Sequence, residues 1–237
     1  MMMLPATLHR MALVLILATT TGLVGCATGP DREPSDPLED FNRAAYSFND
    51  MLDRAVMEPL ARGYSYITPD PVNRGVTNFF NNLRDLRSAL NNLLQFKIGR
   101  AFSDVGRVAV NSTIGILGLM DVASNMNLPR YDEDFGQTLG VWGFGSGPYI
   151  VLPFLGPSSG RDAIGVVMDW YTDPVTYIDD NTTRYALRGL DLVDTRADLL
   201  TASRVLEQAA LDPYAFIRDA YLQRREDLVY DGNPPLE

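Results

Sequence analysis

The sequence predicts an all-α protein with one folded domain, and two patterns support this prediction. Apolar residues recur at three- and four-residue steps, as on one face of an amphipathic helix. No alternation of apolar and polar residues lasts long enough to predict a sheet. In addition, four Asp-Pro pairs precede such segments. The Asp can accept free backbone N–H groups at a helix start, and the Pro has no N–H to leave unpaired. These pairs are Asp36-Pro37, Asp70-Pro71, Asp173-Pro174 and Asp212-Pro213.

The first predicted helix begins at Asp36, where Glu39 has the spacing of a capping box. It should end before Pro59, because proline disrupts a helix interior. Its apolar stripe is Leu38, Phe41, Ala45, Phe48, Leu52 and Val56. Further stripes follow at residues 72–83, 86–94, 163–170, 187–197 and 214–228. Core packing is the simplest interpretation of each stripe.

The N-terminus predicts a lipoprotein signal peptide over residues 1–25. A basic pair, His9-Arg10, precedes an uncharged apolar stretch that is too short to span a bilayer. Leu23-Val24-Gly25-Cys26 then forms a lipobox, with Cys26 as the lipidation site. The alternative is an ordinary signal peptide with a chance cysteine. Residues 26–35 are predicted to form a short polar tether, and Ala27 favours the outer membrane.

Composition excludes several classes of function. The chain has 20 basic and 30 acidic residues, a balance that does not suit nucleic acid. The only histidine, His9, lies in the predicted signal, so no Ser-His-Asp triad or histidine zinc site is expected. Lys97 is the only lysine and leaves a Ser-Lys dyad as the one remaining nucleophilic pair. We therefore predict no enzymatic activity, no metal and no cofactor.

Two uncharged segments depart from the helical pattern, at residues 108–120 and 135–160. The second contains seven glycines and three prolines among large apolar residues. Irregular backbone in hydrocarbon leaves polar groups unpaired, so this segment should form a hairpin, be buried, or line a water-accessible cavity. Gly143, Gly145, Gly147 and Pro148 are predicted to form its bend. A buried glycine-rich core loop is the alternative, and a phosphate-binding loop is disfavoured because no Lys-Ser/Thr follows.

Several uncommon strings in one order make the chain resemble the MlaA family, also called VacJ-like lipoproteins, over residues 26–237. They are Asp36-Pro37-Leu38-Glu39 with Phe41-Asn42-Arg43, Asn78-Phe79 with Asn82-Leu83, Asn111-Ser112-Thr113-Ile114-Gly115 with Gly118 to Asp121, Phe135-Gly136-Gln137-Thr138-Leu139-Gly140, the run from Gly145 to Phe154, and Asp212-Pro213-Tyr214 with Tyr221-Leu222-Gln223-Arg224.

This resemblance implies a ring-shaped helical domain, here residues 36–232 with a short tail at 233–237. The ring would lie in the inner leaflet of the outer membrane around an amphipathic channel. Mislocalised outer-leaflet phospholipids would pass through it to the periplasmic carrier MlaC, and their removal would maintain the lipid asymmetry of the outer membrane. A porin trimer of the OmpC/OmpF type would be the membrane partner. The family's N-terminal helix near the ring matches Asn42 and Arg43. Its gating hairpin matches Phe135, Gly136, Gly140, Trp142, Gly143, Gly145, Gly147, Pro148, Tyr149 and Pro153.

Two other functions stay open at this point. A structural lipoprotein that stabilises a porin or envelope complex would also need a lipid anchor and apolar stripes. A phospholipase is disfavoured by the missing histidine. The uncharged Gly/Pro segment favours transport over a passive scaffold.

Overall fold

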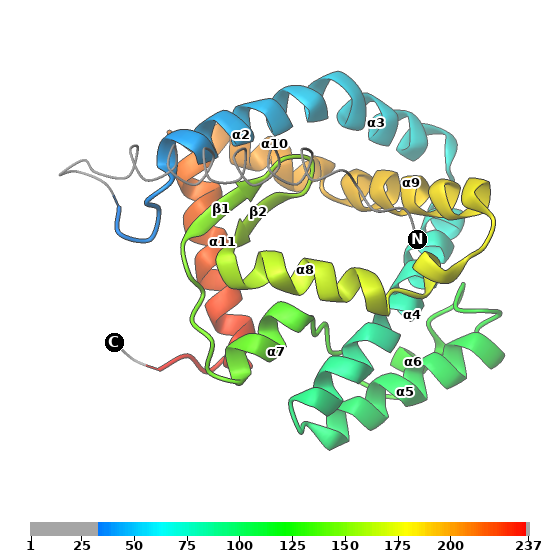
Figure 1. The fold of residues 1–237 in the computed structure, drawn as a ribbon. Coiled ribbons are helices and arrows are strands. Elements are labelled where there is room, and N and C mark those ends of the chain that lie inside the picture. Colours follow the sequence, from blue (N-terminus) through cyan, green and yellow to red (C-terminus); the bar gives the residue numbers. More distant parts are fainter. Residues whose placement is uncertain (1–32, 236–237) are drawn as a thin grey trace, which may run out of the picture.

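The computed structural model describes residues 33–235 and confirms that the protein is predominantly helical. Figure 1 shows α2 and α3 along one edge, α4 along a second and α11 along a third. The signal peptide, Cys26 and most of the predicted tether lie outside the described residues. In chain order the elements are α2 (Glu39–Leu52), the π-helical η1 (Asp53–Met57), α3 (Glu58–Ile67), α4 (Asp70–Leu94), α5 (Ile98–Thr113), α6 (Val122–Asn125), α7 (Phe135–Val141), β1 (Tyr149–Leu152), β2 (Gly156–Ser159), α8 (Gly160–Thr172), the 3-10 turn η2 (Pro174–Tyr177), α9 (Asn181–Asp198), α10 (Leu200–Ala209) and α11 (Pro213–Val229).

The prediction that the first helix ends before Pro59 is wrong. The chain continues from α2 through η1 into α3, and Pro59 lies in the first turn of α3. Within η1 the backbone hydrogen bonds join residues five apart instead of four, as in the hydrogen bond from Glu58 N–H to the Asp53 carbonyl. This wider turn accommodates a proline that has no N–H and whose ring would crowd the carbonyl four residues back.

Two of the four predicted helix caps are confirmed. Asp173 accepts the backbone N–H of Val175 at η2, and Asp212 accepts that of Ala215 at α11. Asp70 is instead the first residue of α4, with no side-chain cap at that end. Asp36 does not cap α2, which begins at Glu39, so the predicted capping box is also wrong. Asp36 has a different role because it is buried among side chains that are distant in the sequence.

The chain also contains a two-stranded sheet. The sequence analysis gave a hairpin as one possibility for residues 135–160, but no sheet was expected from alternation. Strand β1 pairs with β2 in antiparallel register, with Tyr149 opposite Ser159 and Leu152 opposite Gly156. Each strand has four residues, which is too short for a clear alternation. The hairpin turn lies at residues 153–155. The glycine-rich run at 143–148, predicted to form the bend, lies between α7 and β1 instead.

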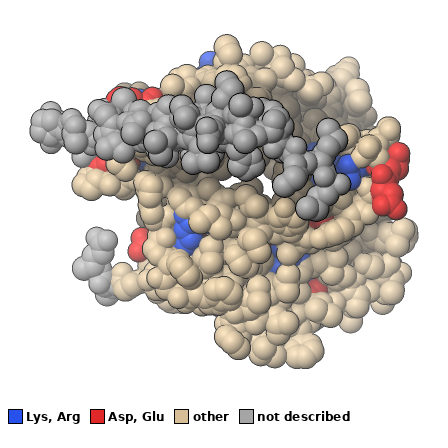
Figure 2. Space-filling view, viewed as in Figure 1, with Lys and Arg blue, Asp and Glu red and all other residues tan. Residues whose placement is uncertain are grey.

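The distribution of polarity is the reverse of that in an ordinary globular domain. Only ten hydrophobic residues are buried in the described part of the chain, and five of them are alanines, whereas twenty polar or charged residues are buried. Many large apolar side chains are exposed, and Figure 2 shows one face on which few charged residues appear. Within residues 33–235, no helix has the length and hydropathy needed to cross a membrane.

Candidate functional site

The hairpin is attached to α2 by two asparagines seven residues apart, which places them on one face of the helix. Asn42 donates to the Tyr149 carbonyl at 3.0 Å and accepts the Val151 N–H at 2.8 Å. Asn49 donates to the Leu152 carbonyl at 3.0 Å and accepts the Phe154 N–H at 2.8 Å. The two side-chain amides therefore form hydrogen bonds with backbone groups along the edge of β1 that does not face β2. Of the two, the sequence analysis identified only Asn42.

A buried carboxylate, that of Asp36, joins this edge to α11. It accepts from Asn42 Nδ2 at 2.8 Å and from the Tyr214 hydroxyl, and it lies 3.5 Å from Arg218 Nη1. Burial, together with the hydrogen bond to Asp36, raises the pKa of Tyr214 far above its ordinary value. The hydroxyl therefore stays protonated and donates to Asp36.

The predicted residue Arg43 lies on the outer side of the same contact. Its guanidinium pairs with Asp212 at 2.8 Å and with Glu39 at 2.7 Å, and it covers the Tyr214 ring at 4.3 Å. These contacts tie the start of α2 to the start of α11. Asn42 and Arg43 are thus brought together with Tyr149, which the sequence analysis assigned to the hairpin.

Gly136 and Gly140 are closely packed positions in α7. A Cβ atom on Gly136 would lie 2.5 Å from Asp162 Oδ1 and 2.8 Å from Arg225 Nη2. A Cβ on Gly140 would lie 2.7 Å from a methyl group of Val229. Arg225 joins the elements here by binding Asp134, which caps α7, and Asp162 in α8. Arg225 lowers the pKa of both Asp134 and Asp162 against the raising effect of burial.

The loop from Trp142 to Pro148 has a different character. Gly143 and Gly147 adopt left-handed backbone, with φ of 93° and 69°. A Cβ on Gly143 or Gly145 would meet nothing within 4 Å. The Trp142 indole N–H donates to the Leu94 carbonyl at 3.1 Å, and its ring packs edge-on against Phe135. The loop is therefore held at Trp142 and open at the two following glycines.

Exposed apolar side chains also lie at the hairpin tip and in the other uncharged segment, residues 108–120. Phe154 and Leu155 at the tip are 72% and 67% exposed. In the 108–120 segment, Ile116 and Leu117 adopt left-handed backbone that side chains of this kind rarely adopt. The exposed large hydrophobic residues of that segment are Ile114, Ile116, Leu117, Leu119 and Met120. Pro153 lies between β1 and the exposed tip.

A cavity of about 250 Å³ lies beside the hairpin, between α2, η1, α10 and α11. One part of its lining is apolar or aromatic and includes Tyr46, Val151, Leu206 and Ile217. The other part carries charges of both signs, from Asp50, Asp53, Arg54, Arg196 and Glu207. Arg196 binds Asp53 of η1 through two hydrogen bonds of 2.7 and 2.8 Å. This cavity is amphipathic, and the sequence analysis did not identify its charged lining.

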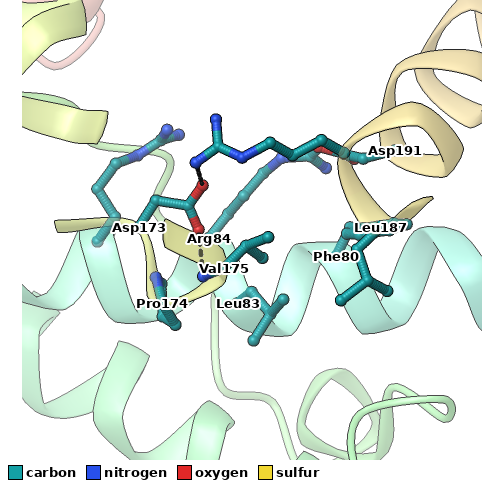
Figure 3. A pocket seen from close by; sticks show the side chains of 10 residues that line it. Phe80, Leu83, Arg84, Asp173, Pro174, Val175, Leu187 and Asp191 are labelled. Atoms are coloured by element: carbon teal, nitrogen blue, oxygen red, sulfur yellow. Dashed lines mark hydrogen bonds and ion pairs between the residues drawn. The ribbon is translucent and has the colours of Figure 1, made fainter. Parts of the chain in front are cut away.

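A smaller pocket of about 90 Å³ lies between α4, η2 and α9 (Figure 3). Three arginines line it, Arg84, Arg87 and Arg188. The sequence analysis missed this cluster because its members come from two helices about a hundred residues apart.

Two observations on the described residues give little support for a catalytic site. No group of three or more His, Cys, Asp or Glu within residues 33–235 is placed to hold a metal ion. The Lys97 ammonium, which formally could serve a Ser-Lys dyad, lies 3.3 Å from Glu133 and 2.6 Å from Asp231. The ammonium is thus held in ion pairs with two carboxylates, an arrangement that does not suit a general base.

The fold and the site define a class of protein: a helical domain with many exposed apolar side chains, an interior of charged networks and an amphipathic cavity beside a short hairpin. The sequence model of the MlaA lipoprotein family matches residues 34–228. The chain belongs to this family, as the resemblance in its sequence predicted.

Relatives cover most of the chain. The Intermembrane phospholipid transport system lipoprotein MlaA of Escherichia coli K12 is 37% identical over 226 residues, which are 90% of this chain and 86% of that protein. The protein of the same name from Haemophilus influenzae is 36% identical over 224 residues, 91% of this chain and 89% of its own length. An uncharacterized protein of Rickettsia bellii is 36% identical over 84% of this chain and 78% of its own.

A solved structure agrees with the fold. It was reported as the structural basis for maintenance of bacterial outer membrane lipid asymmetry. Its chain superposes with a TM-score of 0.72 at 34% sequence identity, covering 82% of this chain and 99% of that one.

Proposed function

We propose that this protein removes mislocalised phospholipids from the outer leaflet of the outer membrane and passes them to a periplasmic carrier. The relatives named as intermembrane phospholipid transport lipoproteins support this function. The observation that carries it is the reversed polarity of the domain. The many exposed apolar side chains suit surrounding hydrocarbon, while buried charged networks keep polar groups paired away from lipid.

The domain would form a ring in the inner leaflet, with the amphipathic cavity as part of the route. A phospholipid that crosses a bilayer unaided must bring a charged headgroup through hydrocarbon, which is costly. The charged lining of the cavity would shelter the headgroup, and Tyr46, Val151 and Ile217 would contact the acyl chains. No covalent bond is made or broken in this mechanism.

The hairpin and its preceding loop would control access to this route. Asn42 and Asn49 hold β1 against α2, which directly adjoins the cavity through Asn49 and Asp50. Movement would therefore concentrate in the loop that contains Gly143 and Gly145, where the packing is open. Gly136 and Gly140 would hold α7 in place during this movement, and Tyr149, with Pro148 before it and Pro153 after it, would keep β1 positioned.

Cys26 would anchor the chain by its lipid, and the exposed apolar surface would bind the other membrane components. We propose a porin trimer of the OmpC/OmpF type as the membrane partner and MlaC as the carrier. Residues 36–232 would form the transport domain, residues 26–35 the tether and residues 233–237 a short tail.

The test is the phospholipid content of the cell surface in a deletion strain that carries either the wild-type gene or Cys26→Ala. Surface phospholipid should rise on deletion and return to normal only with the lipidated protein. Unchanged surface phospholipid together with altered porin levels or assembly would instead establish the structural lipoprotein function.

A further inference from the structure

The arginine pocket is built from three separate elements that fix its chemistry. Arg84 and Arg87 lie on α4, Arg188 lies on α9, and the η2 turn with its cap Asp173 closes one side (Figure 3). Phe80, Leu83 and Leu187 are among its apolar walls. The volume of about 90 Å³ is several times what one water molecule needs. The pocket is thus large enough for a compact polar group of a few atoms.

The charges of the lining leave one positive charge in excess. Arg84 pairs with Asp191, and Arg188 lies 3.3 Å from Asp173. Arg87 is the third guanidinium, and its ion pair with Asp132 is long, at 3.8 Å. It also attracts the Asp169 carboxylate, whose pKa it lowers against the larger raising effect of burial. The Nε of Arg87 is buried and has no hydrogen-bond acceptor in the part of the chain that the structure describes. Two arginines are therefore neutralised by the lining carboxylates, and Arg87 is the guanidinium with the weakest pairing.

Exposed aromatic side chains lie on two elements that line this pocket, η2 and α9, and on α8, which precedes η2. Trp170 and Tyr171 at the end of α8, Tyr177 of η2 and Tyr185 of α9 are each more than half exposed. Trp170 is connected to the pocket directly, because Arg188 stacks on its ring at 4.5 Å. Arg188 also donates to Thr176 Oγ1, next to Tyr177 in the chain. Tryptophan and tyrosine gather at the headgroup level of membranes. A cationic pocket among such residues would lie at the depth of lipid phosphates.

We propose that this pocket binds the phosphate group of a monoanionic phosphodiester, with Arg87 as its main cationic contact. Guanidinium groups donate two parallel hydrogen bonds to phosphate oxygens, and a single negative charge matches the excess charge of the lining. The source of the phosphate would be a lipid headgroup at the membrane surface, an interpretation that rests on the proposed membrane function. Free inorganic phosphate shares the same chemistry and is distinguished by experiment.

The experiment is a ³¹P NMR titration of the purified full chain in phosphate-free detergent with two separate probes. One probe is dihexanoylphosphatidylglycerol, a water-soluble lipid with one phosphodiester, and the other is inorganic phosphate. We expect Arg87→Gln to weaken lipid binding about tenfold, since a charge-assisted hydrogen bond is lost. Arg87→Lys, which keeps the charge, should recover part of the affinity.

Arg62→Gln is the matched control, because Arg62 is exposed on α3 and pairs with Glu58 one turn away. It should bind both probes as the wild type does, and thermal melts should show that both variants are folded. Loss of lipid binding alone in Arg87→Gln identifies a lipid site, and loss for both probes identifies a phosphate site open to either source. Equal affinity of Arg87→Gln and wild type for both probes would overturn the proposal.

Transport is measured in parallel so that the two proposals can fail separately. If the wild-type gene does not restore surface phospholipid in the deletion strain, the proposed function is wrong. If the wild-type gene restores surface phospholipid while Arg87→Gln binds both probes normally, only the proposal of a phosphate-binding pocket is wrong.

Discussion

The two parts of the uncharged segment at residues 135–160 use glycine for opposite purposes. In α7, Gly136 and Gly140 allow α8 and α11 to approach so closely that a Cβ atom would lie within 3 Å of a neighbour. In the following loop, Gly143 and Gly145 have nothing near them. The same residue type therefore marks the most tightly packed and the least packed parts of one segment. Glycine content alone does not distinguish a hinge from a close helix contact.

Charge follows the same division. In the packed part, Arg225 of α11 pairs with both Asp134, at the start of α7, and Asp162 of α8. The loop itself carries no charge, and its neighbours at the hairpin are held by neutral asparagine amides. Buried ion pairs are costly to break, so the packed part should resist movement. Substitutions in the packed part and in the loop should therefore change stability by different amounts, even where they look equivalent in the sequence.

The largest effect is expected at Gly165, where α8 crosses α7. A Cβ there would lie 2.5 Å from the Gly136 nitrogen, a backbone atom that cannot turn aside. Gly165→Ala should lower the free energy of unfolding by about 3 kcal/mol. Gly189→Ala on α9 is the control, because nothing lies within 4 Å of it. Denaturant titration in detergent measures both, and equal stability of the two variants would refute the close crossing.

The next effect is expected at the asparagine clamp. Asn42→Ala leaves the Tyr149 carbonyl, the Val151 N–H and Asp36 without their buried partner. We expect a loss of about 2–3 kcal/mol. Asn49→Ala should cost about 1 kcal/mol, since its bonds lie nearer the surface. A larger loss for Asn49→Ala than for Asn42→Ala would show that the hairpin is held at its tip instead of its base.

A pH effect of about 1–2 kcal/mol is expected from Asp169. Its carboxylate accepts the Phe135 N–H at the start of α7, and burial raises its pKa to about 6. The folded state thus holds this proton more tightly than the unfolded state. The contribution of Asp169 to stability is greatest below pH 4 and declines as pH rises to 6. Asp169→Asn should remove this decline, and identical pH profiles for variant and wild type would contradict it.

The smallest effects are expected in the loop. Gly147→Ala should cost about 1 kcal/mol, because φ of 69° disfavours a side chain. Gly145→Ala should change stability by less than about 0.5 kcal/mol, since its φ is ordinary and its surroundings are empty. The pair is measured by thermal denaturation. If Gly145→Ala proved as destabilising as Gly165→Ala, the loop would not be open.

The sequence was informative where structure depends on neighbouring residues. Asp173 and Asp212 cap helices as predicted because a cap needs only the next few residues. Asp36 has the same Asp-Pro signature, but its partner Tyr214 is 178 residues away and no local pattern contains it. Pro59 does not interrupt the helical path, because the π-helical turn η1 precedes it. Asn49, seven residues after Asn42 on the same helix face, could have been found from that spacing.

The sequence alone indicated the candidate site only as a stretch of the chain, without its contacts to other helices. The missing charges at residues 135–160 indicated an unusual region, and the family resemblance supplied its interpretation. The charged lining of the cavity and the arginine pocket depend on α2, α4, α9 and α10 packing together. Their arginines and aspartates look like ordinary solvated helix positions until those helices are placed.

The most direct measurement uses asymmetric vesicles that carry the purified lipoprotein, with a labelled phospholipid placed in one leaflet at a time. The account predicts that label from the leaflet opposite the lipid anchor reaches the soluble carrier faster than label from the anchored leaflet. Equal transfer from both leaflets, or none from the opposite leaflet, would contradict it.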